Sequence, residues 1–108
     1  MIIVIVERDP IVRIDMEETL KAAFEGATVS SVSTADEIDD ISADILITDS
    51  PLQRQNLATW LAQGAQIIST GAQDQNAGGS RIDGVVQLSR PFSSEMLLQM
   101  VEQVSNHA

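Results

Sequence analysis

The chain opens with five consecutive β-branched aliphatic residues, from Ile2 to Val6. β-Branched side chains favour extended backbone, and a run without polar alternation indicates a strand that is covered on both faces. Strands of this kind occur mainly in parallel sheets whose faces are packed against helices. The segment therefore predicts a buried strand of a parallel sheet.

A helix is expected directly after this strand. Asp9 followed by Pro10 is typical of an N-cap and a first helical position. Apolar residues then recur at roughly helical spacing, and Gly26 is expected to cap the carboxyl end of the helix. The expected apolar stripe consists of Ile11, Ile14, Leu20, Ala23 and Phe24.

Strand and helix signals alternate along the rest of the chain. Strands are expected over 27–33, 45–48, 66–69 and 84–88, and helices over 34–41, 52–62 with Gly64 as its stop, and from Ser93 onward. The polar segment 71–80 is either a frayed helix or a loop. This alternation predicts one α/β domain over residues 1–108, with helices on both faces of a parallel sheet. The last helix should bury Met96, Leu97, Met100, Val101 and Val104.

Composition excludes several classes of function. The net charge is −10 with only six basic residues, so a nucleic-acid or anionic membrane surface is not expected. Without cysteine there can be no disulfide or thiolate metal site, and the single histidine, His107, argues against a histidine-based catalytic or zinc site. No apolar run approaches the length of a membrane helix, and no signal peptide is evident, so a cytoplasmic location is expected.

Charged and polar residues follow the predicted strands at their carboxyl ends, where open parallel sheets bind ligands. Carboxylates, arginines and a hydroxyl brought to one edge predict a site for an anion or a phosphoryl group. The residues are Glu7, Arg8 and Asp9 after the first strand, Asp49 after 45–48, Thr70 after 66–69 and Arg90 after 84–88.

These strand-end residues resemble the receiver domain of two-component response regulators, across essentially the whole chain. The segment from Ala43 to Asp49 is similar to the family's third strand and its phosphoacceptor, and Arg90-Pro91-Phe92 is similar to its Lys-Pro-Phe element. The resemblance implies a flavodoxin-like fold with a five-stranded parallel sheet in the order 2-1-3-4-5.

The resemblance also implies roles for individual residues. Asp49 would accept a phosphoryl group from a histidine kinase or a histidine phosphotransfer protein, Glu7 would help to bind Mg²⁺, and the Thr70 hydroxyl would bind the phosphoryl oxygen. The domain would then signal by contact with a downstream protein or as a homodimer. It would be a phosphoacceptor with at most weak self-phosphorylation and autodephosphorylation, rather than an enzyme.

Several positions depart from the family pattern, among them Arg90 in place of its lysine and Pro51 shortly after the acceptor. Arg8 stands where the family has a second acidic metal ligand, and Gln87 stands where it has an aromatic switch residue. Arginine is always protonated and cannot ligate Mg²⁺, so metal affinity should be weakened or lost. Either Arg8 and Arg90 replace the metal, or Arg8 pairs with unmodified Asp49 and holds one state, or Asp9 supplies the missing carboxylate.

Other interpretations stay open. The chain could be a pseudo-receiver that docks partners without phosphorylation, or a small-molecule binder on a flavodoxin-like fold, although the loop Glu7-Arg8-Asp9-Pro10 has no phosphate-binding glycine. Asp49 could also serve only as a helix N-cap, and the Thr70 hydroxyl could bond only to backbone.

Overall fold

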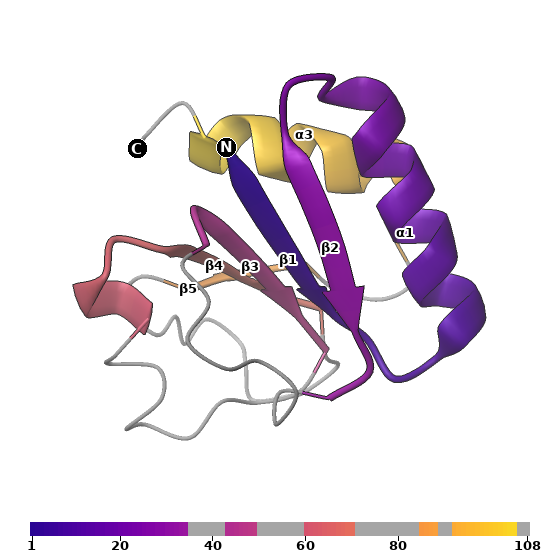
Figure 1. Ribbon diagram of the computed structural model, residues 1–108, viewed down its shortest axis with the longest axis horizontal. Helices are drawn as coiled ribbons and strands as arrows, with labels where there is room; N and C mark the ends of the chain where they lie inside the picture. The colour runs from indigo at the N-terminus through magenta and orange to yellow at the C-terminus, as the bar shows by residue number, and fades with distance from the viewer. Residues whose placement is uncertain (35–42, 50–59, 71–84, 89–91, 106–108) are drawn as a thin grey trace.

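The computed structural model describes residues 1–34, 43–49, 60–70, 85–88 and 92–105 (Figure 1). One parallel sheet with the strand order β2-β1-β3-β4-β5 organises these residues, which confirms the expected architecture and order. The strands are β1 (Ile2–Val6), β2 (Thr28–Val32), β3 (Ile45–Thr48), β4 (Gln66–Ser69) and β5 (Val85–Gln87).

Helices cover both faces of the sheet. On one face, α1 (Pro10–Ala23) and α3 (Ser94–Ser105) pack against each other and over the side chains of Ile3 and Ile5 (Figure 1). On the other face, the helical residues 60–62 bring Trp60 against Val4 and Leu46. Because β1 and β3 are covered on both sides, the side chains of residues 3–6 and 45–48 are almost completely buried, as the unbroken aliphatic run predicts, whereas Ile2 at the start of β1 is exposed.

The start of α1 agrees with its sequence signals, but its end does not. Asp9 is the N-cap, and its Oδ1 accepts hydrogen bonds from the N–H groups of Ile11 at 2.9 Å and Val12 at 3.4 Å. The helix ends at Ala23 with Phe24 as its C-cap, so the expected C-cap role of Gly26 is wrong. Phe24, with φ of −120° and ψ of 78°, already lies outside helical geometry, two residues before Gly26.

The buried face of α1 also differs from the expected stripe. Met16 and Leu20 are buried, whereas Ile11 and Ile14 are 78% and 57% exposed. The core-facing residues lie four positions apart, which places them on one side of the helix. Ile11 and Ile14 lie outside that row, so the prediction that they join the core is wrong.

The last helix, α3, starts as expected, because the Ser93 hydroxyl accepts a hydrogen bond from the Met96 N–H at 3.2 Å. Leu97, Val101 and Val104 are buried, and Met100 packs against them. Met96 is 43% exposed, so its predicted place in the core is wrong.

Gly64 ends the helix that contains residues 60–62, as the sequence predicts. Its φ of 90° lies in the left-handed region that favours glycine. The Gly64 N–H donates to the Leu61 carbonyl at 3.0 Å, and the Ala65 N–H donates to the Trp60 carbonyl at 3.2 Å. This pair of bonds is the Schellman arrangement, which turns the chain directly into β4.

Several expected elements fall outside the described residues: residues 35–41 of the helix expected over 34–41, residues 52–59 of the next helix, and the polar segment 71–80. Within the described part of the chain, no helix is long and apolar enough to cross a membrane.

A charged group links α1 to the edge strand β2. Glu17 accepts a hydrogen bond from the Ser31 hydroxyl at 2.5 Å through Oε2 and from the Lys21 ammonium at 2.9 Å through Oε1. The Ser31 hydrogen bond, followed by that of Lys21, lowers the pKa of the Glu17 carboxyl below its ordinary value. Folding therefore favours the ionised form of Glu17, and the link is strongest when this carboxyl is charged.

Replacing Ser31 with alanine is expected to lower the free energy of unfolding by about 1 kcal/mol at neutral pH, because Glu17 loses a hydrogen bond to its charged form. Since folding lowers this pKa, the contribution is present above the ordinary pKa of glutamate and is lost as the pH falls through the lowered value. Urea unfolding at several pH values measures both effects. Ser30→Ala on the same strand is the matched control, because Ser30 is exposed. An equal loss in both variants would contradict the assignment.

Candidate functional site

The predicted site residues directly follow the carboxyl ends of adjacent strands. The Asp49 N–H donates to the Val6 carbonyl at 3.0 Å, and the Thr70 N–H donates to the Thr48 carbonyl at 2.8 Å. The parallel ladder therefore continues one residue beyond β3 and β4. Since neighbouring strands lie about 5 Å apart, Glu7, Asp49 and Thr70 form a row along one edge of the sheet.

Asp49 is held by Arg8 from the neighbouring strand end. The Arg8 backbone N–H donates to Asp49 Oδ2 at 3.0 Å, and the guanidinium Nε of Arg8 lies 3.6 Å from the same oxygen. The side chain of Asp49 is only 8% exposed, whereas that of Arg8 is 72% exposed. The Asp49 carboxylate is thus buried and fixed at this edge, and the Arg8 guanidinium beside it is exposed to solvent.

Glu7 and Asp9 lie next to this pair, and both carboxylates accept hydrogen bonds from main-chain N–H groups. Glu7 is 3% exposed, and its Oε2 accepts a hydrogen bond from the Asp9 N–H at 3.2 Å. The Asp9 carboxylate caps α1, as described above. The predicted capping role of Asp9 is therefore present, and this carboxylate is engaged at the start of the helix instead of being directed to a metal.

Arg13 reaches the same edge, and this contact was not predicted from the sequence. Its Nη1 donates to the main-chain carbonyl of Glu7 at 3.1 Å. Side chains on a helix tilt toward its amino end, so a long residue one turn beyond the N-cap can reach back to the preceding strand end. The available sequence signal for this contact was the position of Arg13, four residues after the N-cap Asp9.

Thr70 is completely buried, and its hydroxyl donates to the carbonyl of Thr48, the residue before Asp49, at 3.4 Å. The sequence also allowed the Thr70 hydroxyl to bond only to the main chain, and a main-chain bond is present. The bond is long, so the hydroxyl can exchange it for a stronger acceptor at little cost.

Two predicted residues have no described side chain. Arg90 lies outside the described residues, and of Gln87 only the main chain is described, paired with Ser69 in the register of β4 and β5.

The donor set of the site does not match that of a magnesium site. Among the described residues, no group of three His, Cys, Asp or Glu side chains could hold a metal ion. One oxygen of each carboxylate at the edge accepts a main-chain N–H, and the position of the second acidic ligand is taken by Arg8. A hard cation needs several oxygen ligands, and here it would meet a guanidinium group instead.

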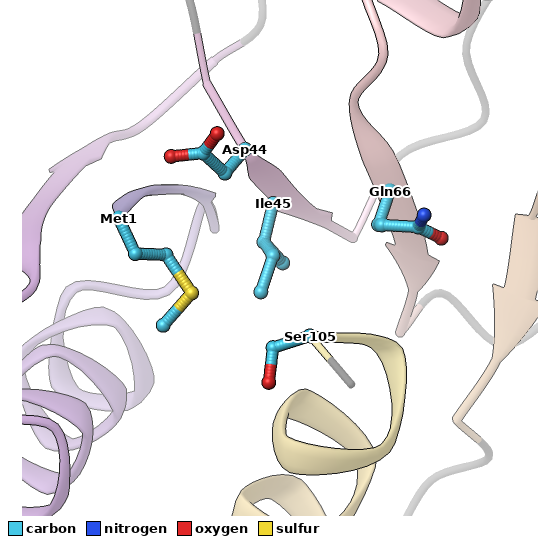
Figure 2. A pocket seen from close by; sticks show the side chains of 5 residues that line it. All are labelled: Met1, Asp44, Ile45, Gln66 and Ser105. Atoms are coloured by element: carbon cyan, nitrogen blue, oxygen red, sulfur yellow. The ribbon is translucent and has the colours of Figure 1, made fainter. Parts of the chain in front are cut away.

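A pocket of about 310 Å³ lies at the opposite edge of the sheet, where β1, β3 and β4 begin (Figure 2). Its lining carries no basic side chain, and the Oδ2 atom of Asp44 accepts a hydrogen bond from the Ile2 N–H at 2.7 Å. The lining residues are Met1, Asp44, Ile45, Gln66 and Ser105.

The arrangement at the carboxyl edge suits a reaction of a carboxylate with an electrophilic anion. Asp49 offers a fixed carboxylate, Arg8 and Arg13 bring positive charge to the end of the neighbouring strand, and Thr70 carries a hydroxyl donor one strand away. Guanidinium groups bind phosphoryl oxygens in forked geometry and stabilise the charge that develops during phosphoryl transfer.

Comparison with known proteins identifies the fold. No family model matches the sequence, and no curated protein matches it. The structure is similar to the crystal structure of a response regulator receiver protein from Sinorhizobium medicae WSM419, with a TM-score of 0.74 and 21% sequence identity. The match covers 98% of this chain and 94% of that chain. This chain therefore has the receiver fold, as its strand-end residues indicated.

Proposed function

We propose that this receiver fold serves two-component signalling, with Asp49 accepting a phosphoryl group from a histidine kinase or a histidine phosphotransfer protein. The observation that carries the proposal is the placement of Asp49. Its side chain is 8% exposed at the end of a central strand, with Oδ2 held by Arg8 and with Glu7 and Thr70 at the adjacent strand ends.

The proposed reaction transfers one phosphoryl group between two proteins. A carboxylate oxygen of Asp49 forms a P–O bond while the P–N bond of the donor's phosphohistidine breaks. The bonding pair leaves with the imidazole nitrogen, and the ring is released neutral because its other nitrogen already carries a proton. The product is an acyl phosphate on Asp49, and the protein acts as the acceptor rather than as an enzyme.

Exposed apolar residues next to this edge offer a surface for the donor. Ile11 and Ile14 lie in the first half of α1, shortly after the strand end that carries Glu7, and both are exposed. Burial of exposed aliphatic side chains is a usual source of binding energy at protein interfaces. The proposed donor would contact this pair while it presents its phosphohistidine to Asp49.

The ion pair between Arg8 and Asp49 supports a second candidate, a pseudo-receiver that docks partners without phosphorylation. In this function the guanidinium would neutralise unmodified Asp49 and hold the domain in one state. The exposure of Arg8, at 72%, argues against a rigid lock, since exposed ion pairs contribute little free energy.

Beryllium fluoride separates the two candidates because it mimics an aspartyl phosphate. A receiver is expected to show amide shifts at Arg8, Asp49 and Thr70 in nitrogen-15 correlation spectra, because these residues surround the modified carboxylate. The Asp49→Asn variant is expected to show none. Wild-type spectra that stay unchanged at saturating beryllium fluoride would contradict the receiver proposal and favour the pseudo-receiver.

A further inference from the structure

The positive charge at the Asp49 edge is supplied by the protein itself. Arg8 faces Asp49 through both its backbone N–H and its guanidinium group, and Arg13 is anchored on the main chain of Glu7. Two of the six basic residues in a chain of net charge −10 therefore meet at one edge. These two cations stand beside the carboxylates of Glu7, Asp9 and Asp49, and they can offset part of the negative charge that a phosphoryl group would add to this edge.

The carboxylates at this edge are poorly arranged for a divalent cation. Glu7 is buried with Oε2 on the Asp9 N–H, and Asp9 is committed to the start of α1. Asp49 Oδ2 already accepts a hydrogen bond from the Arg8 N–H and forms an ion pair with the Arg8 guanidinium. A cation placed beside Asp49 would compete with the Arg8 guanidinium for Oδ2 and would be repelled by its positive charge.

We propose that Asp49 takes up its phosphoryl group without a divalent cation, with the Arg8 guanidinium as the phosphoryl clamp and Arg13 as a second, fixed positive charge. This inference rests on the proposed receiver function. The P–O bond forms and the P–N bond breaks as described above, and no additional reactant is needed.

The exposure and geometry of Arg8 allow it to contact position 49 both before and after Asp49 is phosphorylated. Its backbone N–H keeps Asp49 Oδ2 in place, while its side chain, 72% exposed, is free to turn from Oδ2 toward a phosphoryl group attached to Asp49. The guanidinium then exchanges one anionic partner for a more highly charged one. Arginine can stabilise the charge of a transferring phosphoryl group, as a metal ion does elsewhere.

The test uses phosphoramidate, a small donor with a P–N bond, and measures phosphoryl uptake by intact-protein mass spectrometry. Uptake by the wild-type protein is expected to proceed at the same rate in EDTA and in millimolar Mg²⁺. Arg8→Gln should slow uptake by about tenfold or more in both, because it removes a charge-assisted interaction. Lys21→Gln is the matched control, since it removes the same charge far along α1 and should leave the rate unchanged.

Arg8→Asp is the decisive variant because it exchanges the cation for a carboxylate beside Asp49 and Glu7. Its uptake is expected to become dependent on Mg²⁺. Mn²⁺ should broaden its amide signals at Glu7 and Asp49 but leave those of the wild-type protein unchanged. This binding readout does not depend on phosphorylation.

The outcomes separate the inference from the function on which it rests. Wild-type uptake that stops in EDTA, or Mn²⁺ broadening at Asp49 in the wild-type protein, would overturn metal independence and leave the receiver function standing. Absence of uptake with and without Mg²⁺ would overturn the receiver function and the inference together.

Discussion

Replacing Asp49 with asparagine is expected to abolish phosphoryl uptake, with no residual rate above that of an unreactive protein. The amide is not a nucleophile toward phosphorus, and the other described residues at the carboxyl edge offer no substitute. Glu7 is 3% exposed, and Asp9 caps α1. Mass spectrometry after incubation with a phosphodonor measures the effect.

The change is nearly isosteric, so the loss can be assigned to chemistry and not to misfolding. The side-chain oxygen of asparagine can still accept the Arg8 N–H that Asp49 Oδ2 accepts at 3.0 Å. Asp15→Asn is the control, because Asp15 is an exposed carboxylate on α1. Asp15→Asn should keep the full rate. Continued uptake by Asp49→Asn would show that another residue is the acceptor.

Leu20→Ala is expected to lower the free energy of unfolding by about 2–5 kcal/mol, a large part of the stability of a small domain. Leu20 is completely buried between α1 and the sheet, in the cluster that contains Ile3 and Val101. Removing most of its side chain leaves a cavity that the surrounding strands cannot readily fill. Urea unfolding followed by circular dichroism measures the change.

Ile14→Ala is the matched control on the same helix. Ile14 is 57% exposed, so its truncation should change the free energy of unfolding by only about 0.5 kcal/mol or less. The sequence places Leu20 and Ile14 in the same apolar stripe, so the pair of variants tests which face of α1 is buried. Equal losses would contradict the observed orientation of the helix.

The strands could be predicted closely because their signals are local. The ranges 2–6, 45–48 and 66–69 are reproduced as β1, β3 and β4, since short aliphatic runs covered on both faces leave little choice of boundary. Ser93 and Gly64 were also recognisable, because capping and a left-handed turn depend on the residue itself.

Helix orientation was harder to predict because it depends on tertiary packing. α1 is one apolar-rich helix with several possible stripes, and the sequence alone favoured the one containing Ile11 and Ile14 over the one containing Met16. The rotation of α1 is decided by its contacts with the sheet and with α3, which lies at the other end of the chain. The placement of Met96 in the core was wrong for the same reason, because the rotation of α3 also depends on its packing.

The candidate site was partly accessible from the sequence. The edge location of Glu7, Arg8 and Asp49 follows from their positions after strands, and their placement in the structure agrees. The contact of Arg13 was missed because a helical side chain that reaches back to a strand end leaves no periodic signal. The roles assigned to these side chains remain predictions that need measurement.

The proposed receiver function requires that Asp49 carries an acyl phosphate, and borohydride reduction detects such a group directly. Borohydride converts a phosphorylated aspartate to homoserine and leaves free carboxylates unchanged. Trypsin then releases the peptide from Ala22 to Arg54, whose other carboxylates serve as internal controls. Homoserine is expected at position 49 alone after treatment with a phosphodonor. Homoserine at another position, or an unaltered peptide after full exposure to the donor, would contradict the proposed function.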